Sequence, residues 1–417
     1  MTGRDQPGHR ATGLASAGEP LAVGEPEPPS TADAPSPPGL ARFFAFQTVA
    51  EFSFTGGIWI LYLRHRGFSL AEIGLAESVF HLAPITLELP SGSFADVIGR
   101  KSSLVAGALL IAASAALMLR ADSLWLLLPA MYLNGAAYAF RSGATQAFLY
   151  DSLAAGEESG RFTGLWGKLL SASYVVFAAT TWLGAALAER DFAWPYGLTV
   201  ASGLAAAWLA SGLREPERER AVHRGMAGTI REALGLIRGK PGLARLLVFG
   251  AVLFTLSTLV ALYAQAVLAE QGLPPSRVGL VIGVTFLCTA VGSWFAGRLG
   301  GRWGFRTWTP LVTLAIVGAA LGMGSGVLAL AVGLYLLAEF VTGVFEPLLA
   351  AAINEGLPGA QRATILSVEG FLFSFTMVWA FPLFGVAAER FGWLAAYALA
   401  ALVPLALLGP LLRARNG

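Results

Sequence analysis

Long runs of apolar residues, separated by short polar segments, dominate the chain from about residue 42 onward. A helix that crosses a bilayer needs about 20 mostly apolar residues. Twelve runs of this kind occur in two sets of six, at 42–63, 70–94, 102–120, 124–149, 162–187, 193–213, 244–269, 277–298, 308–327, 328–353, 364–388 and 391–412. The pattern therefore predicts an all-α membrane protein with twelve transmembrane helices in two six-helix halves.

Two segments lack this pattern. Residues 1–39 are rich in Pro, Gly, Ala and Glu, so we expect a disordered tail that cannot bury enough surface to fold. The segment 214–243 alternates Arg and Glu, and its spacing at 229–238 predicts a short amphipathic helix on the membrane surface. The expected domains are thus the tail, a first half at 40–213, this linker and a second half at 244–413.

The composition agrees with a membrane protein, since 13% of residues are charged, against about 25% in soluble proteins. Because Lys and Arg favour cytoplasmic loops, their placement predicts the orientation. With a cytoplasmic amino terminus, the outside receives only Arg64, Arg66, Arg120, Arg190, Arg277 and Arg390. We therefore expect a protein of the cytoplasmic membrane with both termini in the cytoplasm. Its single cysteine, Cys288, excludes a disulfide within one chain.

A polar turn between two apolar runs occurs twice. The first copy, Gly92–Lys101, reads Gly-Ser-Phe-Ala-Asp-Val-Ile-Gly-Arg-Lys, and the second copy is Gly297–Arg306. One constant offset of 205 residues also relates glycines before and within these turns, namely Gly67 and Gly272, Gly74 and Gly279, and Gly99 and Gly304. One half of the chain is therefore a diverged copy of the other.

The pattern Gly-x-x-x-Asp-x-x-Gly-Arg-Lys at the end of a second membrane helix resembles the loop motif of the major facilitator superfamily. The first copy is complete, whereas the second has Gly301 at the acidic position and Phe305 at the first basic one. The resemblance covers about residues 40–413. It implies a transporter with two pseudo-symmetric halves around a central cavity, lined by spans one, four, seven and ten.

Charged side chains at membrane depth are costly, so each is a functional candidate. Glu51 and Arg141 lie near the middle of the first and fourth runs, and Glu346 follows Arg141 by the same offset. The resemblance places these three together in the cavity, with Glu339 on nearly the same helical face as Glu346. We expect Glu51 or Glu346 to carry a proton and Arg141 to hold a carboxylate ionised or to bind substrate. The alternative is an ion pair that only fastens the bundle.

Glu77, His81 and Glu88 follow one another at steps of four and seven, so they share one face of the second span. A His beside a carboxylate titrates near neutral pH, which makes the three candidates for proton transfer. The alternative for His81 is a buried neutral ring bonded to Glu77. Glu369 and Lys168 lie nearer the cytoplasmic side and are weaker candidates.

The resemblance gives the repeated turn the role of a conformational latch. It implies that Asp96 caps the eleventh helix, where negative charge is favoured, and pairs with Arg100. Asp151 matches the acidic residue that Arg100 is expected to meet. The latch then comprises Gly92, Asp96, Gly99, Arg100, Lys101 and Asp151. In the alternative interpretation, the basic residues only set the topology.

The embedded charges lean acidic, and an acidic cavity favours protons and cations. Residues 141–153, Asn354 and 362–367 resemble the corresponding segments of drug:proton antiporters. However, residues 169–187 contain no Pro and so lack the Gly-Pro motif of antiporters. We expect proton-coupled efflux of a lipophilic or cationic compound, with proton-coupled uptake of a small polar nutrient as the alternative.

Other classes of function fit less well. The four His residues are scattered at His9, His65, His81 and His223, so we expect no metal site and no catalytic cluster. The chain has no phosphate-binding loop, which argues against ATP as the energy source. We expect a monomeric, non-enzymatic transporter without a cofactor, whose partners are a small molecule, protons and the lipid bilayer, with no nucleic acid.

Overall fold

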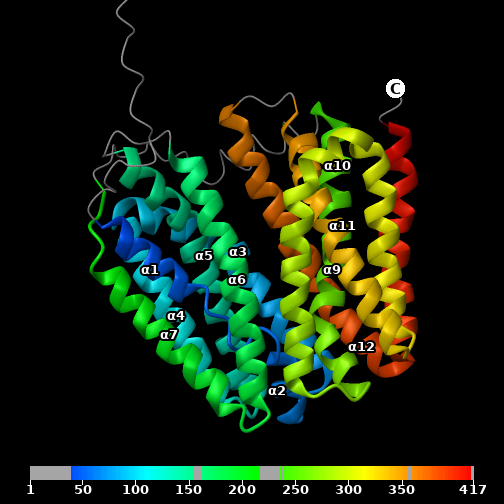
Figure 1. Cartoon of the computed structure of the whole chain (residues 1–417), viewed down its shortest axis with the longest axis horizontal. Helices are drawn as coiled ribbons and strands as arrows, with labels where there is room; N and C mark the ends of the chain where they lie inside the picture. The colour runs from blue at the N-terminus through cyan, green and yellow to red at the C-terminus, as the bar shows by residue number, and fades with distance from the viewer. Residues whose placement is uncertain (1–38, 155–160, 217–234, 236–238, 356–358, 415–417) are drawn as a thin grey trace, which may run out of the picture. The chain divides into compact units, whose positions relative to one another are not determined.

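The computed structural model describes residues 39–154, 161–216, 235, 239–355 and 359–414, and the regular elements in these ranges are α-helices. Figure 1 shows them in the order α1 (Leu40–Ala50), α2 (Trp59–His65), α3 (Leu70–Val97), α4 (Arg100–Arg120), α5 (Leu124–Ala154), α6 (Phe162–Ala188), α7 (Ala193–Ser211), α9 (Pro241–Glu270), α10 (Pro275–Gly324), α11 (Leu328–Asn354) and α12 (Gly359–Ala414). The expected tail, apart from Gly39, and the expected amphipathic helix, apart from Gly235, lie outside the described residues.

These helices form twelve membrane spans within the described ranges. α1 and α2 together make the first span, because the chain leaves the helical conformation between Glu51 and Ile58. α10 and α12 each contain two spans, since Gly304 and Gly392 turn the chain with positive φ angles of 68° and 79°. Seven of the described helical segments, both long ones included, are apolar enough to cross a membrane. The predicted all-α, twelve-span fold is confirmed.

The internal repeat marks the same turn before the second and the eighth spans. Gly67 and Gly272 both have positive φ angles, 91° and 89°, which glycine adopts without steric cost. Ser69 then caps α3: its Oγ accepts the N–H of Glu72 at 3.1 Å, and the Glu72 carboxylate accepts the N–H of Ser69 at 2.8 Å.

The helices α1–α7 form one bundle and α9–α12 a second one beside it (Figure 1). The two bundles meet where α3 packs against α12 and where α6 packs against α10. A Cβ atom on Gly74 of α3 would lie 2.6 Å from the carbonyl oxygen of Phe381, and one on Gly279 of α10 would lie 3.1 Å from that of Thr181. Glycine therefore permits close helix packing between the halves at both places.

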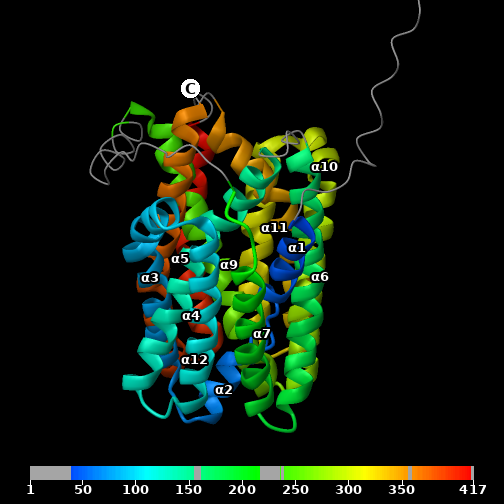
Figure 2. The same cartoon turned by 90° about the vertical axis from the view of Figure 1, so that its left-hand side faces the viewer.

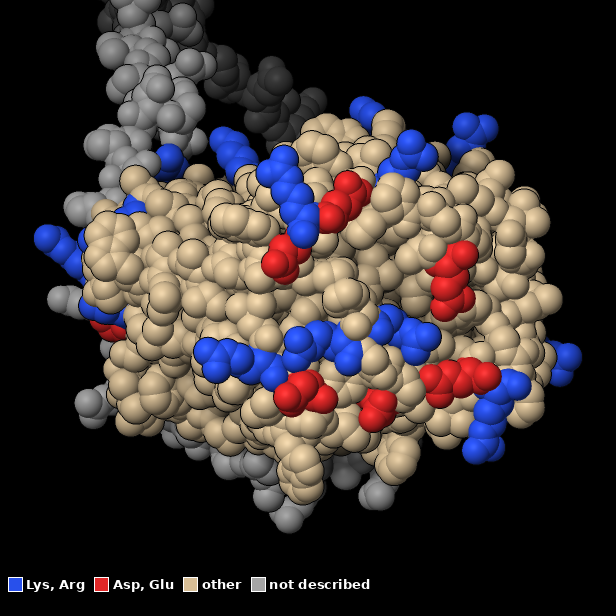
Figure 3. Space-filling view, turned by 90° about the horizontal axis from the view of Figure 1, so that it is seen from below, with Lys and Arg blue, Asp and Glu red and all other residues tan. Residues whose placement is uncertain are grey.

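The two ends of the helical body differ. The start of α1 and the end of α12 lie at one end, which we name the terminal face, and α2 lies at the other, the α2 face (Figures 1 and 2). The turn Ile98–Gly99 between α3 and α4 belongs to the terminal face. On the α2 face, a row of basic side chains runs across the middle with acidic side chains beside it (Figure 3).

Candidate functional site

The predicted pair of Glu51 and Arg141 is an ion pair at the break in the first span. Arg141 on α5 donates from Nη2 to Oε1 of Glu51 at 2.8 Å, and from Nη1 to the carbonyl oxygen of Ala50 at 3.0 Å. Gln47 donates from Nε2 to the same Glu51 oxygen at 2.6 Å. Arg141 therefore holds both the carboxylate and the end of α1.

A cavity of about 570 Å³ in the first half surrounds this pair, and we call it the first cavity. Its polar lining includes Gln47, Glu51, Glu77, Asn134 and Arg141, and its aromatic lining includes Phe52, Trp59, Phe80, Tyr138, Trp166 and Phe177. In the part of the chain that the structure describes, Oε1 of Gln47 and Nε of Arg141 are buried without a hydrogen-bond partner. One acceptor and one donor of the residues that line this cavity thus have no described protein partner.

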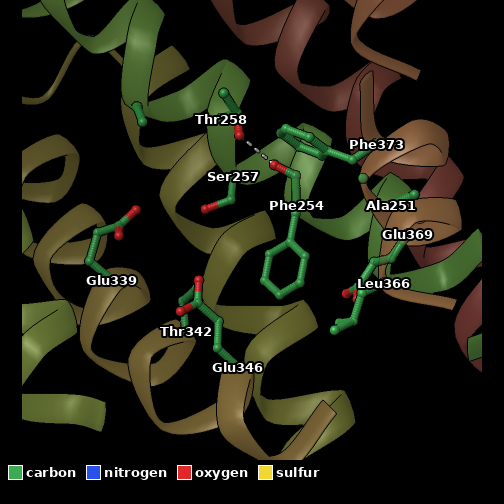
Figure 4. Close-up of a pocket in the computed structure, with 12 residues that line it drawn as sticks. Ala251, Phe254, Ser257, Thr258, Glu339, Thr342, Glu346, Leu366, Glu369 and Phe373 are labelled. Carbon is green, nitrogen blue, oxygen red and sulfur yellow. Dashed lines mark hydrogen bonds between the residues drawn. The ribbon is translucent and has the colours of Figure 1, made fainter. Parts of the chain in front are cut away.

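A second cavity of about 520 Å³ lies in the other half, between α9, α11 and α12. Glu339 and Glu346 reach it from α11 and Glu369 from α12, and Figure 4 shows Phe254 of α9 between Glu346 and Glu369 in that view. Oε2 of Glu339 accepts a hydrogen bond from Thr289 at 2.9 Å. The described lining residues include no basic side chain. The second cavity therefore gathers three carboxylates, with no basic side chain among the lining residues that the structure describes.

Among the described lining residues, Glu346 belongs to a different cavity from the pair of Glu51 and Arg141. Glu346 was expected beside Glu51 and Arg141, but it lines the second cavity, and no described residue lines both cavities. Glu369, a weaker candidate by sequence, lies in that cavity with it. The sequence did contain a signal for the place of Glu369. Its spacing puts it on one helical face with Leu366, Gly370 and Phe373, which also line this cavity. Lys168 is exposed, as a side chain that snorkels would be.

The His81 ring lies between the halves. His81 is buried, its Nε2 is 3.5 Å from Oε1 of Glu77, and its ring meets that of Phe373 edge-on at 5.6 Å between centroids. Glu77 lines the first cavity and Phe373 lines the second. The pair thus occupies the wall between the two cavities. Glu88, further along the same face, lies beside Ser367 of α12.

The turn at the terminal face contains the ion pair expected between Arg100 and Asp151. The sequence did not reveal that Glu215, beyond α7, caps α4: its carboxylate accepts the N–H of Arg100 at 2.6 Å and that of Lys101 at 2.9 Å. Gly99, with φ of 136°, leaves the space that this carboxylate fills.

Two expectations about the turn stay predictions. Residues 356–358, which precede α12, lie outside the described residues, so the cap that Asp96 was expected to form there is not described. Gly92 is exposed within α3, with open space where a Cβ atom would lie, so no close packing explains it.

Known proteins resemble this chain in sequence and fold. The family model of the Major Facilitator Superfamily matches residues 43–270. An uncharacterized MFS-type transporter of Bacillus subtilis (strain 168), YxaM, is 21% identical over 363 residues, which cover 84% of this chain and 90% of that protein.

Among solved structures, a mutant of the nucleoside transporter NupG superposes with a TM-score of 0.78 at 12% identity, covering 90% of this chain and 99% of NupG. A D-xylose-proton symporter gives a TM-score of 0.64 at 13% identity, covering 88% and 95%. These likenesses show the fold. The match of the family model over more than half of the sequence shows in addition that the chain belongs to the major facilitator superfamily and is a membrane transporter rather than an enzyme.

Proposed function

We propose that the protein exports a lipophilic or cationic small organic molecule in exchange for protons. The observation that carries this proposal is the second cavity, with Glu339, Glu346 and Glu369 and no basic side chain among its described lining residues. Carboxylates in a site of low dielectric must be protonated or paired. Protons and an organic cation therefore compete for the same groups, which is the requirement for exchange.

The ion pair in the first cavity supplies a second proton-dependent element. A proton on Glu51 removes the negative charge that Arg141 neutralises. The Arg141 guanidinium is then left without a counter-ion at this place, which favours a rearrangement of its contacts. Because Arg141 also holds the Ala50 carbonyl, a change at this pair alters the break between α1 and α2. Protonation of Glu51 is thereby linked to the shape of the first cavity.

The pair of Glu77 and His81 connects the cavities in this proposal. An imidazole ring can accept a proton on one nitrogen and release one from the other. Its place between Phe80 and Phe373 puts it on the boundary that moves when the halves rock. We assign it to proton transfer between the cavities, with Glu88 further along the same helix face.

At the terminal face, we assign Arg100 and Asp151, which pair within the first half, to the support of a latch that closes this side in the outward-open state, with Asp96 as its contact to the second half. The proposal includes Asp96, Gly92, Gly99 and Lys101 in the same latch. We further propose that the protein is a monomer in the cytoplasmic membrane, with its terminal face toward the cytoplasm. Its two halves comprise residues 40–213 and 244–413.

Proton-coupled uptake of a small polar nutrient is the second candidate. The observation that favours it is the absence of Pro from α6, since antiporters of the family carry Gly-Pro in this span. The fold resembles that of a D-xylose-proton symporter, which fits either direction because the likeness is one of fold. The experiment must therefore distinguish the directions.

The test uses purified protein in liposomes that contain a pH-sensitive dye. A panel of lipophilic cations, sugars and amino acids is added one compound at a time. Export by exchange predicts that a lipophilic cation and protons move in opposite directions. Proton movement alongside a sugar or amino acid would replace this proposal with uptake, and no proton movement with any compound would contradict proton coupling.

A further inference from the structure

Two glutamates occupy matching places at the α2 face, one in each half. Glu189 follows the last turn of α6 in the sequence Ala188-Glu189-Arg190. The second half repeats these residues as Ala388-Glu389-Arg390, just before the turn at Gly392. The fifth and the eleventh spans therefore end with the same charged pair.

Each carboxylate reaches across to the first turn of a helix in the other half. Glu189 accepts the backbone N–H of Ser276, in the first turn of α10, at 3.0 Å. Glu389 accepts that of Leu70, the first residue of α3, at 2.6 Å. The first N–H groups of a helix have no partner within it and carry partial positive charge. Both carboxylates thus bind where a negative charge is favoured most.

The repeat relates these two contacts to each other. α3 and α10 begin the second and eighth spans, and the offset that relates Gly67 to Gly272 in the sequence brings Leu70 to within one residue of Ser276. The first contact joins the fifth span to the eighth, and the other joins the eleventh span to the second. Glu189 and Glu389 lie 200 rather than 205 residues apart, but each ends the fifth span of its half, so the two contacts are pseudo-symmetric counterparts.

The helices that these carboxylates join are also closely packed. A Cβ atom on Gly74 would meet the Phe381 backbone, and one on Gly279 would meet Cβ of Ala185 and the carbonyl oxygen of Thr181. Between the halves, Gln265 donates to the carbonyl oxygen of Gly56 and accepts from the N–H of Ile60, both at 3.0 Å. If the α2 face opens, the two carboxylate contacts must break.

We propose that Glu189 and Glu389 form a two-part lock that holds the α2 face closed. Each carboxylate caps a helix of the opposite half, and each is released when the halves rock apart. The lock differs from the latch of Asp96, Arg100 and Asp151, which lies at the terminal face. It acts for export and for uptake alike, because both need the α2 face to open and close.

The test measures the width of the α2 face directly. In a Cys288→Ser background, spin labels at Asp122→Cys and Val327→Cys lie in exposed connections of opposite halves. Double electron-electron resonance on the full chain in nanodiscs gives the distribution of distances between them. We expect Glu189→Ala or Glu389→Ala to raise the ratio of long to short distances roughly three- to tenfold, and the double variant to multiply the two effects.

Glu270→Ala is the matched control. Glu270 also lies at the α2 face, but its Oε2 accepts from Nε1 of Trp393 at 2.6 Å within its own half. Its removal should leave the distances unchanged. Glu189→Gln and Glu389→Gln keep a hydrogen-bond acceptor and should give a smaller shift in the same direction. A double alanine variant that elutes as a folded monomer with wild-type distances would overturn the lock, and so would an equal shift in Glu270→Ala.

Discussion

The Glu51 carboxylate shows how one residue links charge to backbone structure. It receives hydrogen bonds from Gln47 and Arg141, and Arg141 also binds the carbonyl oxygen of Ala50. Removing one member of an embedded ion pair leaves the other charge uncompensated, which costs far more than the pair itself contributes. Protonation of Glu51 therefore changes the contacts of Arg141 and, through Arg141, those of the end of α1.

The carboxylates of the second cavity make a prediction about binding. Glu346→Gln removes one of the three carboxylates that can release a proton and pair with a bound cation, so the affinity for a lipophilic cation should fall roughly tenfold or more. Equilibrium binding of radiolabelled tetraphenylphosphonium to purified protein measures this change. The control is Glu270→Gln, because the Glu270 carboxylate is not among the residues that line the second cavity. Unchanged affinity in Glu346→Gln would remove this residue from the cation site.

Glu189 makes a prediction about pH. Hydrogen bonds from Ser276, helped by the positive charge of Arg277, lower the pKa of Glu189 from its ordinary value of 4.5. A lowered pKa in the closed state means that the contribution of Glu189 to closure is complete above pH 4.5 and is lost as the pH falls through the lowered value. Arg190 and Asp191 are its charged neighbours in the sequence, so a variant is needed to isolate the share of Glu189.

The same spin-label pair checks this expectation. On acidification from about pH 7 to about pH 3, long distances should grow in the wild type, and the response should be smaller in Glu189→Ala. An identical response in both proteins would show that Glu189 does not contribute to the pH dependence.

At the scale of elements, the start of α4 depends on a residue from another segment. Gly99 provides no side-chain cap, and the Glu215 carboxylate accepts two backbone N–H groups there instead. We expect Glu215→Ala to destabilise the protein by about 1 kcal/mol, a typical value for a lost helix cap. Thermal unfolding in detergent measures the effect, with the exposed neighbour Arg214→Ala as the control. Equal stability of both variants would show that water replaces the cap without cost.

The latch at the terminal face gives a separate prediction. Asp96→Asn should slow the transport cycle several-fold without changing substrate preference, because it weakens one conformation and leaves both cavities intact. Initial rates of transport in liposomes with two competing substrates separate the two effects. Wild-type turnover in the variant, at equal protein content, would exclude Asp96 from the latch.

The sequence predicted the spans well because apolar length alone determines what can cross a bilayer. It missed the break between α1 and α2, since Phe52, Phe54 and Ile58 continue the apolar run although Ser53, Thr55 and Gly56-Gly57 interrupt it. It also missed Glu215, Glu189 and Glu389, whose partners are backbone N–H groups far away in the chain. Such contacts depend on how the helices pack, which the sequence does not show. The repeat of Ala-Glu-Arg at 188–190 and 388–390 was the one visible sign of the two glutamates at the α2 face.

The pair of Glu51 and Arg141 was predictable because two opposite charges at equal depth in the membrane require partners. The place of Glu346 was not, because depth and internal symmetry do not reveal which side of the bundle interface a side chain faces. The resemblance to a family placed it in a cavity with Glu51 and Arg141, whereas among the described lining residues it belongs to a different cavity from theirs.

At the scale of the whole molecule, the two faces are held by different contacts. At the terminal face, Arg100 and Asp151 join α4 to α5 within the first half. At the α2 face, Glu189 and Glu389 join the two halves to each other. Between the faces lie two cavities with their own carboxylates. A transporter that rocks about this middle region would change its exposed face and the protonation of these groups in one cycle.

The most direct test of proton coupling compares wild type with Glu51→Gln in liposomes that contain the pH dye. The substrate is the compound with the largest response in the panel. We expect the variant to exchange labelled for unlabelled substrate while a proton gradient no longer drives accumulation, because substrate still binds but the glutamine at this position carries no titratable proton. Gradient-driven accumulation at the wild-type level would show that Glu51 does not carry the coupled proton, and the central claim would fail.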